Sequence, residues 1–326
     1  MKKLFVITGP TAVGKSETGI RLAKMFGGEI VSADSMQIYK GLDIGTGKLT
    51  PEEMCGVTHH MIDVAMPDEN YSVGQYVRQA RDCIDGINSI PLIVGGTGLY
   101  ITALVAGSDF GGAGKSEDIR DKWKEIARQN GNEFVYDYLK KIDAPSADKI
   151  NVNDIKRIIR AIDIYDLTGK PKSSIVGESN AYYSARVIIL TRDRQDLYNA
   201  IETRVDKMFE RGLVKEVEGL IEYKSCQSMQ AIGYKETVRF LTGEITLDEA
   251  VEKIKQNSRN YAKRQMTYFK GMKLADKHFV NFNDFDEISA ALTSAGRTRA
   301  GSCRTGGRAA SGGGRRAPSR ELRARA

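Results

Sequence analysis

The stretch Leu4-Phe5-Val6-Ile7-Thr8 followed by Gly9-Pro10-Thr11-Ala12-Val13-Gly14-Lys15-Ser16 decides the fold. Its second part matches G-x-x-x-x-G-K-[ST] and lies between an apolar run that predicts a buried strand and a segment that predicts a helix. The glycines let successive backbone N–H groups turn toward phosphate oxygens, and the helix N-terminus adds positive potential. Lys15 is expected to reach an outer phosphate and Ser16 to ligate Mg²⁺. The sequence therefore predicts a phosphate loop for a di- or triphosphate.

Short apolar runs recur along the chain at residues 29–32, 91–94, 187–190 and 279–280. They alternate with helical patterns, which favours an α/β fold: a P-loop-type parallel sheet core covered by helices. Residues 117–169 are helical throughout and end at a glycine followed by a proline, so we expect an all-helical insertion domain. Long helices are expected at 195–222 and 246–272. The predicted organisation is the first part of the core at 1–109, the helical insertion at 110–179, the rest of the core with the C-terminal helices at 180–295, and a disordered basic tail at 296–326.

The net charge of the chain is concentrated in this tail. The formal charge of the 326 residues is +7, which by itself suggests a nucleic-acid partner. Residues 296–326 hold nine arginines, one acidic residue and no lysine, so the remainder is close to neutral. The tail is either an arginine-rich RNA-binding segment or a non-native addition, and its lack of lysine favours the second. A nucleic-acid partner must therefore be argued from local clusters in the body of the chain.

The sequence shows no sign of a membrane or an oxidising compartment. No apolar run approaches the ~18 residues of a membrane span, and the run after Lys2 and Lys3 is too short for a signal peptide. The four cysteines are scattered and form no C-x-x-C pattern. We expect a cytoplasmic protein without membrane association, and a monomer by default.

Two missing motifs narrow the choice of phosphate ligand. The chain has no N-K-x-D guanine motif, and the apolar run at 91–94 is followed by Gly95-Gly96-Thr97-Gly98 without the acidic residue that usually completes the Mg²⁺ site of ATPases. Asp193 is a weak candidate for that residue. A diphosphate that departs as a leaving group therefore fits better than a transferred phosphoryl group.

Asp34 follows the second predicted strand. Ligands of open parallel sheets bind at the carboxyl ends of the strands, so Asp34 is expected to face the phosphate loop from the adjacent strand. There it either binds a metal or accepts a proton, or it caps the next helix. Spacing alone leaves these two interpretations even.

Seven stretches, in this order, resemble the tRNA dimethylallyltransferase (isopentenyl-tRNA transferase) family: GPTAVGKS (9–16), SADSMQIYKGLDIGTGK (32–48), HHMID (59–63), VGGTGLY (94–100), RIIRAIDIYDLTGKP (157–171), AIGYKE (231–236) and YAKRQMTYF (261–269). The resemblance implies transfer of a dimethylallyl group from dimethylallyl diphosphate to N6 of the adenosine 3′-adjacent to the anticodon, with release of diphosphate. The phosphate loop, with Mg²⁺ on Ser16, would then hold the diphosphate, and Arg204 would reach it. Asp34 would accept a proton or hydrogen bond from N6, and Thr97 would contact the reacting region.

The resemblance also implies contacts with the tRNA anticodon loop, whose target base must leave its stack. The residues concerned are Asp34, Ser35, Met36, Gln37, Thr97, Arg120, Lys156, Arg157, Arg160, Gly233, Tyr234, Lys235, Lys263, Arg264 and Gln265. By spacing alone, each basic cluster is more often a solvated helix face. We interpret the stretch HHMID (59–63) as a loop that shapes the pocket and not as a metal site.

Three other activities stay open from the residues alone. A phosphate-loop kinase for a small molecule would have no use for the basic helices. A prenyltransferase for free adenine nucleotides would not need the insertion with Lys156, Arg157 and Arg160. A non-catalytic RNA-binding protein would not need the intact Lys15 and Asp34.

Overall fold

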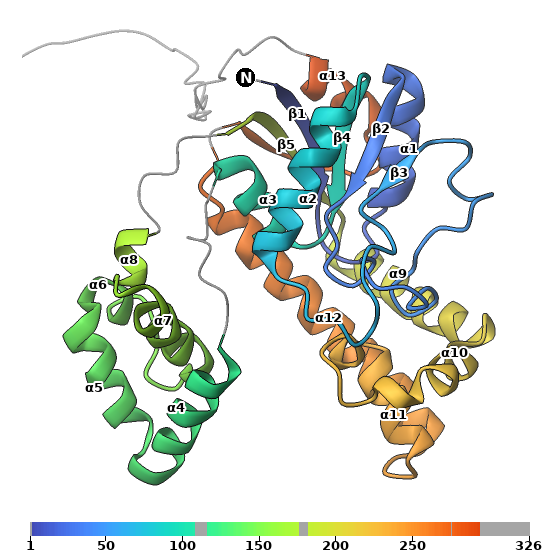
Figure 1. Ribbon diagram of the computed structural model, residues 1–326. Helices are drawn as coiled ribbons and strands as arrows, with labels where there is room; N and C mark the ends of the chain where they lie inside the picture. Colours follow the sequence, from blue (N-terminus) through green and yellow to red (C-terminus); the bar gives the residue numbers. More distant parts are fainter. Residues whose placement is uncertain (1, 108–115, 176–181, 275, 294–326) are drawn as a thin grey trace, which may run out of the picture. The chain divides into compact units, whose positions relative to one another are not determined.

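The computed structural model describes residues 2–107, 116–175, 182–274 and 276–293. Their strands form one fully parallel sheet in the order β3-β2-β4-β1-β5-β6 (Figure 1). The strands are β1 (Lys3–Thr8), β2 (Gly28–Ser32), β3 (His59–His60), β4 (Ile90–Gly95), β5 (Ser184–Thr191) and β6 (Lys277–Asn281). The predicted α/β class with a parallel sheet covered by helices is confirmed.

Helices follow most of the strands. In the core they are α1 (Lys15–Phe26), α2 (Val73–Gly86), α3 (Gly98–Ala106), α9 (Arg194–Glu210), α10 (Leu213–Gly219), α11 (Tyr234–Leu241), α12 (Leu247–Gly271) and α13 (Phe285–Thr293), with short 3₁₀ helices η1 (Ile221–Tyr223) and η2 (Ser228–Gln230). Side-chain caps mark several of their starts, as where the Thr246 hydroxyl and the Glu249 carboxylate form a capping box that begins α12. None of the described helices combines the length and hydrophobicity needed to cross a bilayer.

The structure corrects two predicted elements. The single helix expected at 195–222 is two helices, because Gly212 takes a left-handed conformation with φ of +97° and ends the first run. The pair His59–His60, expected in a loop, is a strand that pairs in parallel with Ile30 and Val31 of β2. A strand of two residues carries no periodicity from which it could be recognised.

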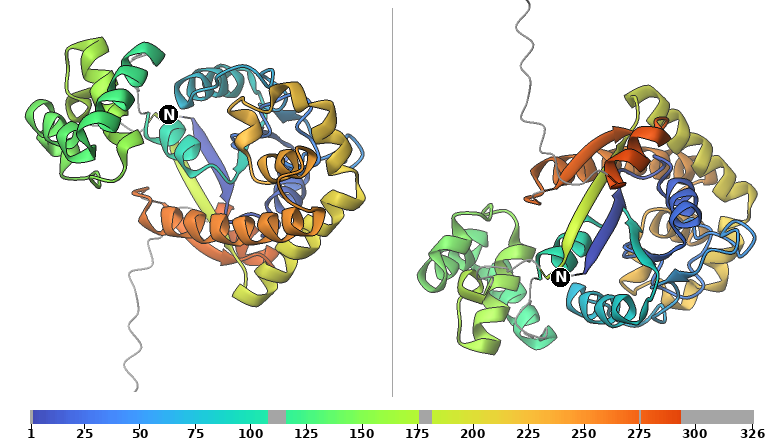
Figure 2. Two further views of the ribbon diagram at one scale, coloured as in Figure 1. Left: turned by 90° about the horizontal axis from the view of Figure 1, so that it is seen from below. Right: turned by 90° about the horizontal axis from the view of Figure 1, so that it is seen from above.

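The sheet is buried on both faces. Along β1, Leu4 and Val6 belong to one hydrophobic core, while Ile7 belongs to another on the opposite face. Helices α2, α3, α10 and much of α12 contribute to the first core, and α1, α13 and the start of α9 to the second (Figure 2). This explains why the strands read as continuous apolar runs in the sequence, as parallel strands covered on both sides usually do.

The phosphate loop follows β1, at the point of the parallel sheet where the order of successive strands reverses. β1 has β4 on one side and β5 on the other, and the chain passes from β1 through α1 to β2. The expectation that Asp34 follows a strand adjacent to β1 is wrong, because β4 lies between β1 and β2. The carboxyl ends of β1, β2 and β4 nevertheless lie at the same edge, where ligands of such sheets bind.

Residues 116–175 form helices joined by short turns, contain no strand, and have their own core. They form α4 (Glu117–Asn130), α5 (Asn132–Ile142), α6 (Ala144–Ala147), α7 (Ile155–Thr168) and α8 (Lys172–Ile175). Trp123, Leu139 and Ile158 are among the buried residues of this core. The predicted insertion is therefore a helical bundle, while its expected limits at 110 and 179 lie outside the described residues.

Candidate active site

The phosphate loop connects β1 to α1 and places two polar side chains at the helix start. Lys15 and Ser16 are the first two residues of α1. The Lys15 ammonium donates to the Pro10 carbonyl over 2.8 Å, so the side chain folds back across the loop. Burial lowers the pKa of Lys15 to about 8, an effect that the nearby Asp34 carboxylate opposes and the Arg204 guanidinium increases. An anion bound in the loop would replace the lost hydration of this lysine.

Arg204, from α9, points to the same loop. Its Nη1 donates to Thr11 Oγ1 over 3.1 Å and its Nη2 to the Thr46 carbonyl over 2.9 Å. A Cβ on Gly47 would lie 2.5 Å from Nη2, so a side chain at this position would displace the guanidinium. The family resemblance implied that Arg204 reaches the diphosphate, and the structure brings Arg204 to the phosphate loop.

Asp34 lies in the turn after β2. Its Oδ1 accepts from the Met36 N–H over 2.9 Å, which forms an Asx turn. The interpretation of Asp34 as a helix cap is wrong, because residues 35–58 contain turns and irregular chain but no helix. Among the described residues, this turn contact engages Oδ1 alone, and Asp34 is one of the residues that line a cavity. The turn fixes the orientation of the carboxylate, and the expected role of Asp34 as a metal ligand or proton acceptor stays a prediction.

Thr97 joins this turn to the end of β4. Its Oγ1 accepts from the Ser35 N–H over 2.9 Å and donates to Ser35 Oγ over 3.2 Å. Its own N–H donates to the Ala33 carbonyl over 3.0 Å. Thr97 thus holds the backbone on both sides of Asp34, and its predicted contact with the reacting region stays a prediction.

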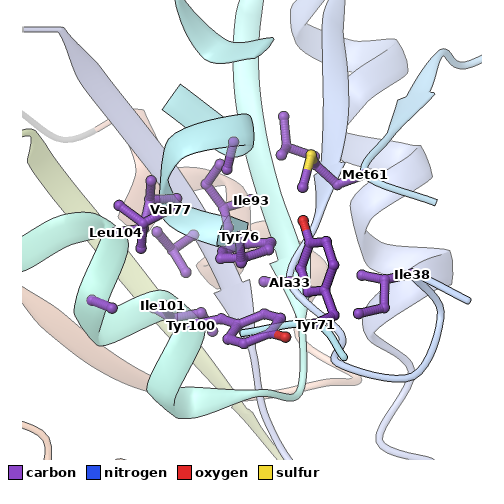
Figure 3. Packing of buried hydrophobic residues seen from close by; sticks show 14 of the residues in the cluster. Ala33, Ile38, Met61, Tyr71, Tyr76, Val77, Ile93, Tyr100, Ile101 and Leu104 are labelled. Carbon is purple, nitrogen blue, oxygen red and sulfur yellow. The ribbon is translucent and has the colours of Figure 1, made fainter. Parts of the chain in front are cut away.

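Aromatic side chains support this turn from within the core. The rings of Tyr76 and Tyr100 stack with centroids 4.1 Å apart, beside Ala33 and Ile93 (Figure 3). The Tyr76 hydroxyl donates to the Ser32 carbonyl over 3.1 Å. The position of Asp34 is therefore set by a packed core and not by a free loop.

Lys15, Asp34 and Arg204 all line a cavity of about 310 Å³. Its walls are formed by Thr11, Ala12, Gly14, Lys15, Ser16, Glu17, Asp34, Gln37, Thr46, Gly47, Ala200, Arg204, Tyr261 and Gln265. A second cavity of about 550 Å³ shares Gly47, Ala200 and Arg204 with it. Burial and the Asp34 charge raise the pKa of Tyr261 to about 12, so its hydroxyl stays protonated at neutral pH. The first cavity thus offers two cations and a hydroxyl to an anion, with one carboxylate for a proton.

Gln265 and Tyr234 were predicted as tRNA contacts, but the structure buries both side chains. The Gln265 amide accepts from the Thr11 N–H over 2.8 Å and donates to the Gly96 carbonyl over 2.9 Å, so it ties the phosphate loop to the end of β4. Tyr234 is 0% exposed and donates its hydroxyl to Glu216. A direct side-chain contact of Tyr234 with RNA is incompatible with this burial.

The other predicted residues of α11 and α12 lie nearer the surface. The Gly233 N–H donates to Glu236 over 2.9 Å, and the Lys235 side chain is 42% exposed. Lys263 and Arg264 are exposed, and the Arg264 guanidinium lies 5.7 Å from the centre of the Tyr261 ring. Their expected tRNA contacts stay predictions.

Basic residues of the helical bundle divide into two kinds. Arg120 Nε donates to the fully buried Asp163 over 2.8 Å, which holds α4 against α7. Arg160 Nη1 donates over 2.7 Å to the same carboxylate from within α7. Lys156 and Arg157 are exposed, and Arg157 pairs with Asp154 one turn earlier over 3.2 Å. The Lys156 side chain is therefore exposed to solvent, whereas Arg120 and Arg160 each neutralise the buried Asp163 carboxylate.

Asp63 forms an ion pair with the buried Lys48. The Lys48 ammonium, 6% exposed, contacts Asp63, Asp43 and the Tyr39 carbonyl. No cluster of three metal-ligating side chains occurs in the part of the chain that the structure describes. A magnesium ion at the phosphate loop would need ligands from a bound diphosphate in addition to Ser16, which is how Mg²⁺ usually binds in phosphate-loop proteins.

Sequence reasoning missed Glu216 and Lys48, which hold the loop between β2 and β3. Both are ordinary charged residues, and only their partners distinguish them from solvated side chains. Glu216 lies outside every quoted motif, and Lys48 ends the stretch SADSMQIYKGLDIGTGK (32–48) without having been given a role.

Comparisons with known proteins agree with the motif order. The family model described as IPP transferase matches residues 37–272, and one described as isopentenyl transferase matches residues 2–69. A tRNA dimethylallyltransferase from a Thermoanaerobacter species is 44% identical over 298 residues, which are 88% of this chain and 95% of that protein. The crystal structure of a tRNA isopentenylpyrophosphate transferase from Staphylococcus epidermidis is 42% identical with a TM-score of 0.65, over 90% of this chain and 99% of that one. Crystallographic snapshots of a eukaryotic dimethylallyltransferase acting on tRNA give 30% identity and a TM-score of 0.74, over 89% and 76% of the two chains.

Proposed function

The chain belongs to the IPP transferase family, and we propose that it transfers a dimethylallyl group to a tRNA adenosine. The proposal is supported by tRNA dimethylallyltransferase relatives that align with this chain over most of their own length. The donor is dimethylallyl diphosphate, and the acceptor is N6 of the adenosine 3′-adjacent to the anticodon. The bond between C1 of the prenyl group and the diphosphate oxygen breaks, and a bond between C1 and N6 forms. Diphosphate leaves, and N6 loses one proton.

One observation carries this proposal: a single cavity joins an anion-binding loop to a carboxylate. Lys15, Ser16 and Arg204 line it together with Asp34. A kinase could use the cations, but a carboxylate opposite them also suits a nucleophile that must lose a proton as an anionic group departs.

Each group has a defined task in this reaction. Lys15 and Arg204 bind the diphosphate and stabilise the charge that develops on it as it leaves. Asp34, oriented by the Met36 N–H, accepts a hydrogen bond or the proton from N6 and directs its lone pair. Magnesium would be held by Ser16 and the diphosphate oxygens, where it would further neutralise the leaving group.

The tRNA is proposed to be read through its anticodon loop. The target base must be extracted from the stack to reach the cavity that contains Asp34. Exposed cations at Lys156, Arg157, Lys263 and Arg264 would contact the RNA backbone, whose phosphates dominate affinity. A monomeric, cytoplasmic enzyme is the simplest form of this proposal.

The test is incubation of the purified protein with Mg²⁺, labelled dimethylallyl diphosphate and unmodified tRNA, with AMP and ATP in parallel. Label in tRNA that nuclease digestion maps to the adenosine after the anticodon supports the proposal. Label on AMP alone would assign the protein to free nucleotides. Consumption of ATP without prenyl transfer would refute it in favour of a kinase.

A further inference from the structure

Glu216, in α10, receives an unusual concentration of hydrogen bonds. Its carboxylate accepts from three consecutive backbone N–H groups, those of Asp43 over 3.2 Å, Ile44 over 2.7 Å and Gly45 over 3.2 Å. We call residues 43–48 the Arg204 loop. The start of this loop is bound by the Glu216 carboxylate of α10, which lies 172 residues after Ile44 in the chain. Neither an amide nor a protonated acid could accept all of these bonds.

Tyr234 completes the contact from α11. Its hydroxyl donates to Glu216 Oε1 over 2.6 Å. Its ring packs so closely against Gly45 that a Cβ on this glycine would lie only 2.4 Å from the nearest ring carbon. Burial and the Glu216 charge raise the pKa of Tyr234, so the hydroxyl remains a donor. Each carboxylate oxygen of Glu216 thus has two donors, and the start of the loop is held by both charge and packing.

The other end of the Arg204 loop forms part of the proposed active site. The Thr46 carbonyl accepts from Arg204 Nη2 over 2.9 Å, and the Gly47 carbonyl accepts from Gln37 Nε2 over 3.4 Å. Thr46, Gly47 and Gln37 all line the cavity that holds Lys15 and Asp34. A displacement of residues 43–45 would therefore be transmitted within two residues to the guanidinium proposed to bind diphosphate.

We propose that Glu216 is a positioning residue for prenyl transfer: it holds the Arg204 loop so that Arg204 stays directed at the phosphate loop. It touches neither substrate and acts through Arg204. The inference rests on the proposed function, because its effect is expected on the step in which diphosphate leaves. Contacts with tRNA are not expected to depend on it.

The test uses Glu216→Gln, which retains the size of the side chain but lacks the second acceptor oxygen. Misplacement of a catalytic group by about 1 Å costs on the order of 10²-fold, so we expect kcat/KM for dimethylallyl diphosphate to fall by about 10²-fold. The KM for tRNA should stay within about twofold of the wild-type value, because the exposed cations are untouched. Glu218→Gln is the matched control, since Glu218 is exposed on the same helix and should leave both parameters unchanged.

A double-mutant cycle separates positioning from general stability. If Glu216 acts through Arg204, Glu216→Gln in an Arg204→Ala background should cost almost nothing further. If the two losses multiply instead, the inference is overturned. Equal losses in the KM for tRNA and in kcat/KM for the donor would also overturn it.

A gentler variant covers the case in which Glu216→Gln does not fold. Tyr234→Phe keeps the ring against Gly45 and removes only the hydroxyl donor, so it should lower kcat/KM for dimethylallyl diphosphate in the same selective way but less. Wild-type kinetics in Tyr234→Phe, with Glu216→Gln unfolded, would overturn the inference. Failure of the wild-type protein to prenylate tRNA would instead refute the proposed function.

Discussion

Affinity for the prenyl diphosphate should depend on pH through Lys15. Its pKa is lowered to about 8 by burial, so the empty enzyme is half neutral at this position near pH 8. One pH unit higher, only about a tenth of the molecules carry the charged lysine, and the Kd should be about tenfold above its value at neutral pH. The bound diphosphate favours the charged amine, so binding near pH 8 should take up about half a proton per site.

The assay is isothermal titration calorimetry with Mg²⁺ and a thiolodiphosphate analogue of the donor, at constant ionic strength. Buffers of different ionisation enthalpy report the protons taken up. Lys15→Arg is the control, because its guanidinium stays charged throughout and should bind with a flat pH profile. In Asp34→Asn the pH at which the Kd begins to rise should be lower than in the wild-type protein, because the Asp34 charge raises the pKa of Lys15. A flat profile without proton uptake in the wild-type protein would refute the reasoning.

Four further results are expected. Between about pH 8 and 10.5 the unfolded chain binds more protons at Lys15 than the folded one, so the free energy of unfolding should rise with pH; urea titrations of Lys15→Met should lack this rise. Asp34→Ala should lower single-turnover prenyl transfer by about 10²–10⁴-fold with little change in tRNA affinity, and unchanged turnover would exclude it as the base. Lys156→Gln should lower the salt slope of tRNA binding by about 1 at constant Tm, whereas Arg160→Gln should also lower the Tm, because a buried carboxylate loses a partner. Removal of residues 296–326 should leave tRNA affinity and turnover intact; collapse of binding in a filter assay would show that the tail is functional.

Local sequence was sufficient for the phosphate loop and for most of the sheet. A glycine-rich loop between an apolar strand and a helix constrains its own backbone, so residues 9–16 could be interpreted without knowledge of the rest of the chain. The apolar runs of the parallel strands likewise report burial on both faces. Errors arose where local signals were weak, as at the two-residue strand His59–His60 and at the helix break at Gly212.

The sequence by itself determined the α/β class, the helical insertion, the phosphate loop and, through the order of its motifs, the family. Only the tertiary structure decided that β4 separates β1 from β2, that Gln265 and Tyr234 are buried, and that Glu216 anchors the loop beside Arg204. The physical reason is one of range. Backbone propensity and periodicity act over a few residues, whereas the partner of a charged or amide side chain is chosen by the packing of segments far apart in the chain. A glutamate that is solvated and one that binds three backbone N–H groups therefore look the same until the fold brings their partners together.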